Sequence, residues 1–480
     1  MSLTSNVKWV ALSKAVQICL QLISLTVLTR LLAPSEYGLM AMATVVTNFT
    51  LIVRDLGTAA AIIQRKELDQ VIKSTVFWLN IMMGASIALV IFISSPLIAY
   101  SFNEPALTPL LLWLSLSFPI ASLGTAQQAL LERESHFRKV ASIEIYASAI
   151  ALIVALGMAY QGFGVYSLAG QTLATCSIST FLLWRSAHWR PSFIFAKSQL
   201  RQLFGFSGNL TTFNMINYFS RNSDSMIIGH YFSAAVLGAY SLAYRLMLFP
   251  LQSLTSVVSR SLYPLMSRRQ DDPEQIKAMY LKVLAFIASI TAPMMAGLAV
   301  LRDPFVVITF GAQWTLVPPI LLWLAPTGFV QSIISTTGSV FMAHGKTQLL
   351  MKLGVLSAIL QVGAFLIGGQ YDVQTLALLY LIANIINAFP AMYFTMRVVN
   401  GSLLEVAQRL FAPLFCSSLM VVALLAATHY SSAILSNQHP VIFTGNIILG
   451  VFVYLISYRL FFAKQMAHVL PAKFARLLYL

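Results

Sequence analysis

Six arginines and aspartates lie well inside long apolar stretches of the sequence, where charged residues are rare. They are Arg30, Arg54, Asp55, Arg221, Asp224 and Arg245. A charged group within a membrane span costs several kcal/mol, so it normally faces a cavity or a partner of opposite charge. Four arginines against two aspartates leave an excess of positive charge, which favours an anionic ligand. The planar guanidinium donates two hydrogen bonds at once, which suits a phosphate or diphosphate.

The spacing of these residues suggests different roles. Arg54 and Asp55 are neighbours that point about 100° apart on a helix, so one could bind ligand while the other braces it. Arg221 and Asp224 lie three residues apart on one helical face, which fits either a ligand site or a structural ion pair. The residues expected to bind a diphosphate are Arg54, Arg30, Arg245 and Arg221.

Further polar residues belong to the same expected cavity. Asp55 or Asp224 could carry a coupling proton or sodium ion, or could balance the charge of the arginines. Three asparagines of the seventh apolar stretch add neutral polar groups to the cavity: Asn214, Asn217 and Asn222. By contrast, Lys14, Glu144 and Lys352 lie near the ends of their stretches, and we expect their charged heads to extend to the membrane interface.

The overall composition is that of a polytopic membrane protein. Of the 480 residues, 58% are hydrophobic and 9% are charged, whereas a soluble domain is about 25% charged. This composition excludes a soluble enzyme. A helix needs about 20 apolar residues to cross a bilayer. Breaks at charges, glycines and prolines predict fourteen such helices: 9–33, 38–63, 75–101, 107–131, 140–160, 164–184, 207–230, 235–259, 279–301, 318–343, 347–368, 374–396, 410–429 and 441–458.

Basic residues predict how these helices are oriented. Most of the 30 Lys and Arg residues fall in connections on one side of the membrane, whereas the connections on the other side contain only Arg302. Because basic loops stay in the cytoplasm, both termini are predicted to be cytoplasmic. The formal net charge of +15 is then a belt that contacts anionic lipid rather than a nucleic-acid footprint.

Two short similarities about 200 residues apart predict an internal duplication. Leu111-Leu112-Trp113-Leu114 resembles Leu321-Leu322-Trp323-Leu324, and Gly38 and Gly238 each open a helix. Two six-helix lobes with the same orientation would surround a central cavity, as in alternating-access transporters. The predicted fold class is therefore all-α, with two parallel-repeat lobes and two extra C-terminal helices. The predicted parts are an N-lobe, 1–185; a cytoplasmic linker, 186–206; a C-lobe, 207–397; helices thirteen and fourteen, 398–460; and a cytoplasmic interfacial tail, 461–480.

The sequence shows no motif for catalysis. Gly345-Lys346-Thr347 ends like a nucleotide-binding loop but lacks the upstream glycine and the preceding strand. The three cysteines are scattered through apolar stretches and predict neither disulfides nor a metal site. We therefore expect no enzyme activity, no metal and no cofactor. The energy sources that remain open are a gradient of H⁺ or Na⁺, the membrane potential and a substrate gradient.

Two blocks of sequence resemble a known family. The first block comprises Thr26–Gly38, Asp55-Leu56-Gly57 and Ile62–Glu67. The second comprises Asp224, Ile228-Gly229, Leu237–Arg245 and Tyr263-Pro264. In order and spacing, and in the length of fourteen helices, nearly the whole chain resembles polysaccharide exporters of the multidrug/oligosaccharidyl-lipid/polysaccharide superfamily. The resemblance is to Wzx-type repeat-unit flippases, particularly colanic-acid-type exporters.

The resemblance implies a lipid-linked substrate. Such flippases move undecaprenyl-diphosphate-linked oligosaccharides across the bacterial inner membrane, and a Wzy-type polymerase then acts on them in exopolysaccharide, O-antigen or capsule synthesis. Related lipid II flippases have cavity arginines on their first, second and eighth helices, which here carry Arg30, Arg54 and Arg245. They also use helices thirteen and fourteen as a groove for the lipid tail.

Two other functions stay open at this point. A cation-coupled multidrug antiporter of the same superfamily is the main alternative, although the first predicted helix carries no carboxylate. A membrane-embedded polymerase or glycosyltransferase would need a large outer loop. The longest outer loop expected here, about 302–317, has one Arg and one Asp and makes a poor active site.

Overall fold

The structure is a computed structural model that describes residues 3–54, 69–196, 218, 222–250, 266, 272–432 and 439–469. All regular secondary structure in these ranges is helical, as the sequence predicts. The chain divides into two compact units, Met1–Gly238 (unit 1) and Ala239–Leu480 (unit 2). This division falls after the predicted linker 186–206, and the predicted lobe boundaries stay predictions.

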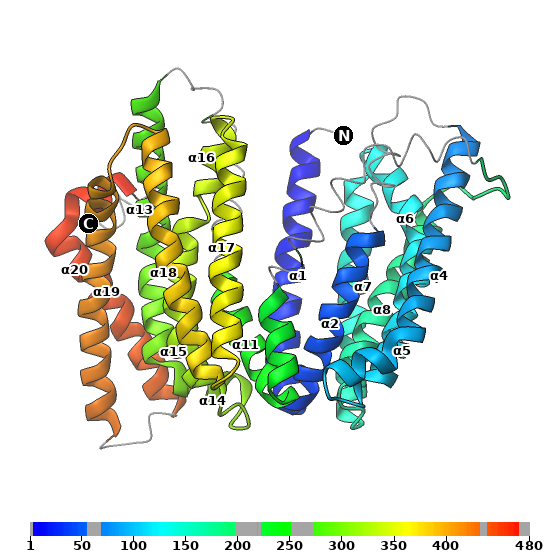
Figure 1. The fold of residues 1–480 in the computed structure, drawn as a ribbon, viewed down its shortest axis with the longest axis horizontal. Helices are drawn as coiled ribbons and strands as arrows, with labels where there is room; N and C mark the ends of the chain where they lie inside the picture. The colour runs from blue at the N-terminus through cyan, green and yellow to red at the C-terminus, as the bar shows by residue number, and fades with distance from the viewer. Residues whose placement is uncertain are drawn as a thin grey trace. The chain divides into compact units, whose positions relative to one another are not determined.

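Unit 1 is a helical bundle in which α7 packs along both α1 and α8, and α4 packs along α6 (Figure 1). Its labelled helices are α1 (Leu3–Leu31), α2 (Pro34–Arg54), α4 (Gln70–Ser101), α5 (Leu107–Ser115), α6 (Ser117–Arg133), α7 (Phe137–Tyr160) and α8 (Tyr166–Ser186). Alanines at every fourth position of α7 are buried: Ala147, Ala151, Ala155 and Ala159. Small side chains on one helical face let neighbouring helices approach closely.

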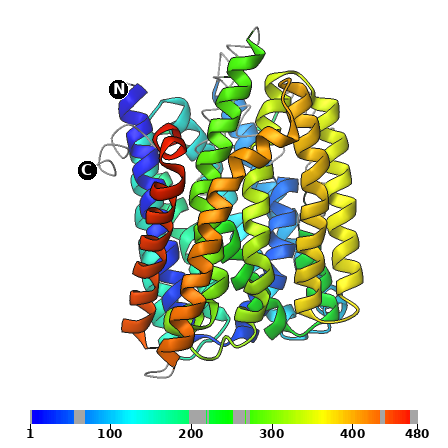
Figure 2. The same ribbon diagram turned by 90° about the vertical axis from the view of Figure 1, so that its left-hand side faces the viewer.

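Helix α11 (Ala234–Pro250) begins in unit 1 and continues into unit 2. The other labelled helices of unit 2 are α13 (Pro273–Val300), α14 (Arg302–Phe310), α15 (Val317–Ile334), α16 (Thr337–Ala343), α17 (Thr347–Gly368), α18 (Val373–Val398), α19 (Leu403–Ser432) and α20 (Pro440–Val469). Helix α13 packs against α15, α19 and α20, and α18 packs between α15 and α17 (Figure 2).

Ten helical segments of the described residues are long and apolar enough to cross a membrane. They coincide with ten of the fourteen predicted spans. The other four are 38–63, 164–184, 207–230 and 235–259: α8 covers 164–184 as a less apolar helix, and the rest fall partly outside the described residues. The number fourteen therefore stays a prediction. The expected outer loop 302–317 is wrong in part, because Arg302–Phe310 forms the helix α14.

Backbone geometry repeats between distant parts of the chain. Ser135 and Gly345, which precede α7 and α17, have φ angles of 57° and 65°. The following amide hydrogen bonds also match, since His136 N–H donates to Leu131 O at 2.9 Å and Lys346 N–H donates to Phe341 O at 2.8 Å. The same turn therefore precedes α7 and α17, and the duplication stays a prediction.

The first part of the predicted linker is fastened to unit 1. Indole N–H groups make two of the contacts: Trp78 Nε1 donates to Ser192 O at 2.9 Å, and Trp189 Nε1 donates to Gln70 Oε1 at 2.7 Å. The Ser192 amide also donates to Ser74 Oγ at 3.0 Å. The residues that follow α8 therefore lie against the N-terminal half of α4.

Candidate functional site

Arg30 lies in the last turn of α1, where the sequence predicts a cavity arginine. Its side chain is exposed, whereas Leu28, Thr29 and Leu32 around it are buried. A cation in the last turn of a helix is also favoured by the helix dipole. The helix dipole therefore stabilises the charge of Arg30, and the exposed guanidinium lies away from the packed interior of unit 1.

Arg245 has a similar setting on α11. Its side chain is exposed, while Ala243 and Met247 on either side are buried, as are Tyr240 and Leu242. Its helix thus packs one face and presents a guanidinium on another. An arginine on an apolar helix is costly unless it faces water or an anion, so this exposed position fits a polar cavity.

Asp224 is buried, with 4% of its surface exposed. Its Oδ1 accepts the Ser225 amide at 2.6 Å. Within the same segment, Asn222 Nδ2 donates to Tyr218 O at 2.9 Å, and the Tyr218 hydroxyl donates to Val45 O on α2 at 2.6 Å. These contacts attach the start of the helix formed by residues 222–231 to α2. Asn222 and Asp224, which the sequence predicts to be cavity residues, therefore take part in packed structure.

The remaining predicted site residues lie outside the part of the chain that the structure describes. α2 ends at Arg54, and the side chain of Arg54 lies outside the described residues. So do four other residues: Asp55, Asn214, Asn217 and Arg221. The diphosphate site, the coupling role of Asp55 or Asp224 and the Arg221–Asp224 pair therefore stay predictions.

A close helix crossing lies next to the turn that follows Arg30. A Cβ atom added at Gly38 would overlap the backbone carbonyl of Ala234, and one added at Gly238 would overlap the backbone carbonyl of Pro34. The added Cβ of Gly238 would also lie 2.9 Å from the Gly38 nitrogen. Only glycine fits at either position, so α2 and the first turn of α11 touch backbone to backbone.

A polar contact between α1 and α7 is not apparent from the sequence. Glu144 Oε2 accepts hydrogen bonds from Ser13 Oγ at 2.8 Å and Gln17 Nε2 at 2.9 Å. We expected Glu144 to extend to the interface, and the structure instead turns it toward α1. The available signal was the spacing of Ser13 and Gln17, which places both residues on one helical face.

A second polar cluster that the sequence analysis missed lies inside unit 2. Gln331 Nε2 of α15 contacts Tyr380 Oη at 2.6 Å and Asn384 Oδ1 at 3.2 Å on α18. One turn further along α18, Asn387 is buried and its Oδ1 accepts no hydrogen bond from the described residues. Buried neutral amides favour the one alignment of α15 and α18 in which each amide is hydrogen-bonded.

The chain is similar to known proteins in both sequence and fold. A family model described as polysaccharide biosynthesis protein matches residues 27–319. The lipopolysaccharide biosynthesis protein WzxC of Escherichia coli is 29% identical over 402 residues, which are 83% of this chain and 82% of the relative. The succinoglycan biosynthesis transport protein ExoT of Rhizobium meliloti is 28% identical over 427 residues, which are 89% and 85% of the two chains. The solved lipid II flippase MurJ, in an inward closed conformation, shares the fold with a TM-score of 0.74 at 16% identity, and the match covers 95% of this chain and 99% of that one.

Proposed function

Because the chain belongs to the family of polysaccharide biosynthesis proteins, we propose that it flips undecaprenyl-diphosphate-linked oligosaccharides across the bacterial inner membrane. The substrate would serve exopolysaccharide, O-antigen or capsule synthesis, and a Wzy-type polymerase would act on the flipped product. The proposed orientation has both termini in the cytoplasm, where the basic connections contact anionic lipid. The proposed process is transport without a chemical step.

The observation that carries the proposal is the exposure of Arg30 and Arg245. Each guanidinium is exposed on a helix that packs another of its faces, with Leu28 and Leu32 buried near Arg30 and Ala243 and Met247 buried near Arg245. An organic cation would be repelled by such arginines, whereas a diphosphate offers the acceptor oxygens that their planar forks recognise. This charge favours the lipid-linked substrate over the cation-coupled multidrug antiporter that the sequence left open.

Transport would follow alternating access. The diphosphate would bind the cavity arginines, Arg54 among them, while the oligosaccharide passes through the polar space and the polyprenyl tail stays in lipid beside α19 and α20. Because water is displaced from the diphosphate, each charge-assisted hydrogen bond gains strength in the less polar cavity. An H⁺ or Na⁺ gradient or the membrane potential would supply the driving force.

The test is complementation of a strain that lacks the gene. Arg30→Ala and Arg245→Ala should each reduce surface polysaccharide and leave lipid-linked oligosaccharide in the inner leaflet, with normal amounts of protein in the membrane. Arg397→Ala is the matched control, because Arg397 is also an exposed arginine in the last turn of a helix, α18. Export at the wild-type level by both test variants would contradict the proposed diphosphate site.

A further inference from the structure

Glu144 is a carboxylate within a membrane span that is held by side chains of another helix. Ser13 Oγ and Gln17 Nε2 of α1 both donate to the same oxygen, Oε2, and Gln17 Nε2 also contacts Ser13 Oγ at 3.1 Å. Lys14 Nζ donates to Gln17 Oε1 at 3.1 Å. Because the carbonyl end of Gln17 accepts from Lys14, its amide nitrogen is turned toward the carboxylate.

The charge of Glu144 has no direct counter-ion in the described part of the chain. The ion pairs found there involve other residues, and Lys14 contacts Gln17 rather than the carboxylate. The hydrogen bonds of Glu144 involve none of the other titratable groups described on α7 and on the helices packed against it: Cys19, Arg30, Glu132, Arg133, Arg138, Lys139, Tyr146, Tyr160, Tyr166, Cys176 and Arg185. Within the described residues, this charge is therefore held by neutral hydrogen-bond donors rather than by a cation, and binding a proton removes it.

Helix α1 is the least buried of the ten membrane-spanning helices, with 11% of its most apolar stretch buried. Besides the Glu144 cluster, Gln171 Nε2 on α8 donates to Ser24 Oγ at 3.1 Å, and the Arg138 guanidinium lies 4.9 Å from the centre of the Trp9 ring. The position of α1 should therefore be sensitive to the strength of the Glu144 contacts.

We propose that Glu144 is a proton-binding site and that proton binding there loosens α1 from α7. A proton from the aqueous phase adds to the carboxylate and gives a neutral acid, and no other bond forms or breaks. The two hydrogen bonds from α1 then lose their ionic character, and charge-assisted bonds are roughly twice as strong as neutral ones. Since Arg30 lies at the other end of α1, movement of this helix moves an arginine of the proposed diphosphate site.

This proposal deepens the proposed function by naming a site for the coupling ion, and its role in transport rests on that function. Proton binding itself does not, so the test uses the purified full chain in lipid nanodiscs without substrate. Infrared spectra recorded across a pH series should show a protonated-carboxyl band at low pH that Glu144→Gln lacks. Glu132→Gln is the matched control, because Glu132 is a half-buried carboxylate whose Oε1 accepts an amide of its own helix, from Gln128 at 2.9 Å.

Electron paramagnetic resonance measures the movement. Spin labels on the exposed native Cys19 of α1 and on a cysteine introduced by Tyr146→Cys on α7 report the separation of the two helices, in a background of Cys176→Ala and Cys416→Ala. The separation should increase at low pH, and Glu144→Gln should hold it at the low-pH value at every pH. Ser13→Ala should shift the wild-type distance in the same direction.

An unchanged infrared band in Glu144→Gln, or a distance that follows pH equally in both proteins, would overturn the proton site. A distance that depends on Na⁺ concentration at fixed pH would overturn it in favour of a sodium site. If both spectroscopic results appear but lipid-linked oligosaccharide is not flipped, the proposed function fails and the proton site stands.

Discussion

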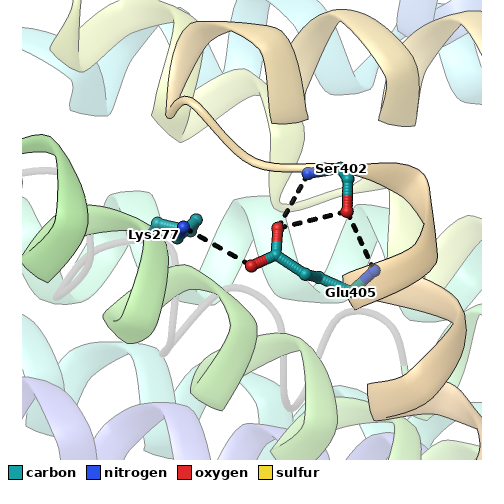
Figure 3. A network of polar contacts seen from close by, with 3 residues as sticks. All are labelled: Lys277, Ser402 and Glu405. Carbon is teal, nitrogen blue, oxygen red and sulfur yellow. Dashed lines mark hydrogen bonds and ion pairs between the residues drawn. The ribbon is translucent and has the colours of Figure 1, made fainter.

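Lys277 and Glu405 join α13 to α19 near their N-termini through an ion pair of 3.4 Å (Figure 3). The same carboxylate accepts the Ser402 amide at 2.8 Å, and Ser402 Oγ accepts the Glu405 amide at 3.3 Å. This reciprocal pattern is a capping box at the start of α19. One glutamate therefore both begins the helix and attaches it to its neighbour.

We expect the cap to contribute more than the ion pair. Ser402→Ala removes the acceptor for a helix N-terminal amide, which costs about 0.5–2 kcal/mol. Lys277→Ala removes an ion pair that is open to solvent, and water and salt screen such pairs so that they contribute little. Thermal unfolding of the purified protein should show the larger decrease in Tm for Ser402→Ala. Added salt should reduce the decrease in Tm only for Lys277→Ala. The reverse order would mean that the ion pair dominates.

The glycine crossing predicts a strong steric effect. Gly38→Leu or Gly238→Leu would place side-chain atoms into backbone that cannot move aside, and overpacking of this kind costs about 1–3 kcal/mol. Both variants should unfold at a lower temperature than wild type. Gly157→Leu is the control, because no heavy atom lies within 4 Å of an added Cβ there. Equal Tm values for all three variants would contradict the close crossing.

Arg245→Lys tests whether recognition needs the guanidinium or only its charge. Lysine keeps the positive charge but cannot donate two parallel hydrogen bonds to a diphosphate. We expect export to fall between that of wild type and that of Arg245→Ala, with normal amounts of protein in the membrane. The measurement is surface polysaccharide per cell in the complemented strain. Full export by Arg245→Lys would show that the charge alone is sufficient.

Asp372 predicts a dependence of stability on pH at the start of α18. Its carboxylate accepts the Thr375 amide at 2.6 Å, and this bond lowers the pKa of Asp372 below its ordinary value. A carboxylate whose pKa is lowered in the folded state stabilises that state at pH values above its unfolded-state pKa. This stabilisation is lost as the pH falls through the folded-state pKa. Asp372→Ala should therefore lower Tm at neutral pH.

The difference between wild type and Asp372→Ala should shrink once the pH falls below about 3.8, the ordinary pKa of an aspartate. Asp372→Asn separates cap from charge, since asparagine is also a good cap and does not titrate. Across this pH range, residue 372 should make no pH-dependent contribution to the Tm of Asp372→Asn. A difference that grows on acidification would mean that the carboxylate destabilises the native state.

The apolar helices could be predicted because the bilayer sets their length and composition. The sequence also singled out Gly38 and Gly238 as matching positions of the predicted duplication, and these glycines are where α2 and α11 touch, although the helices begin four residues earlier, at Pro34 and Ala234. What it could not show was that the two glycines meet each other. Spacing along a helix identifies a face, but the partner of that face depends on packing between segments far apart in the chain.

The same limit explains the missed contacts of Glu144. Near the end of its span, a lone glutamate in the sequence fits an interfacial position, and only the approach of α1 to α7 brings Ser13 and Gln17 within hydrogen-bonding distance. Helix α14 was missed for a different reason. Arg302 and Asp303 have the composition of a loop, and the apolar residues after them are too few to predict a span.

The paired glycines have a consequence for the origin of the chain. Gly38 rests on Ala234 while Gly238 rests on Pro34, so each partner repeats the contact of the other with the roles exchanged. A self-complementary contact of this form is what a two-fold homodimer contains. Under the predicted duplication, one ancestral gene would have encoded both sides of the crossing, and a single substitution would have altered it twice. Fusion would then have freed the two sides to evolve separately.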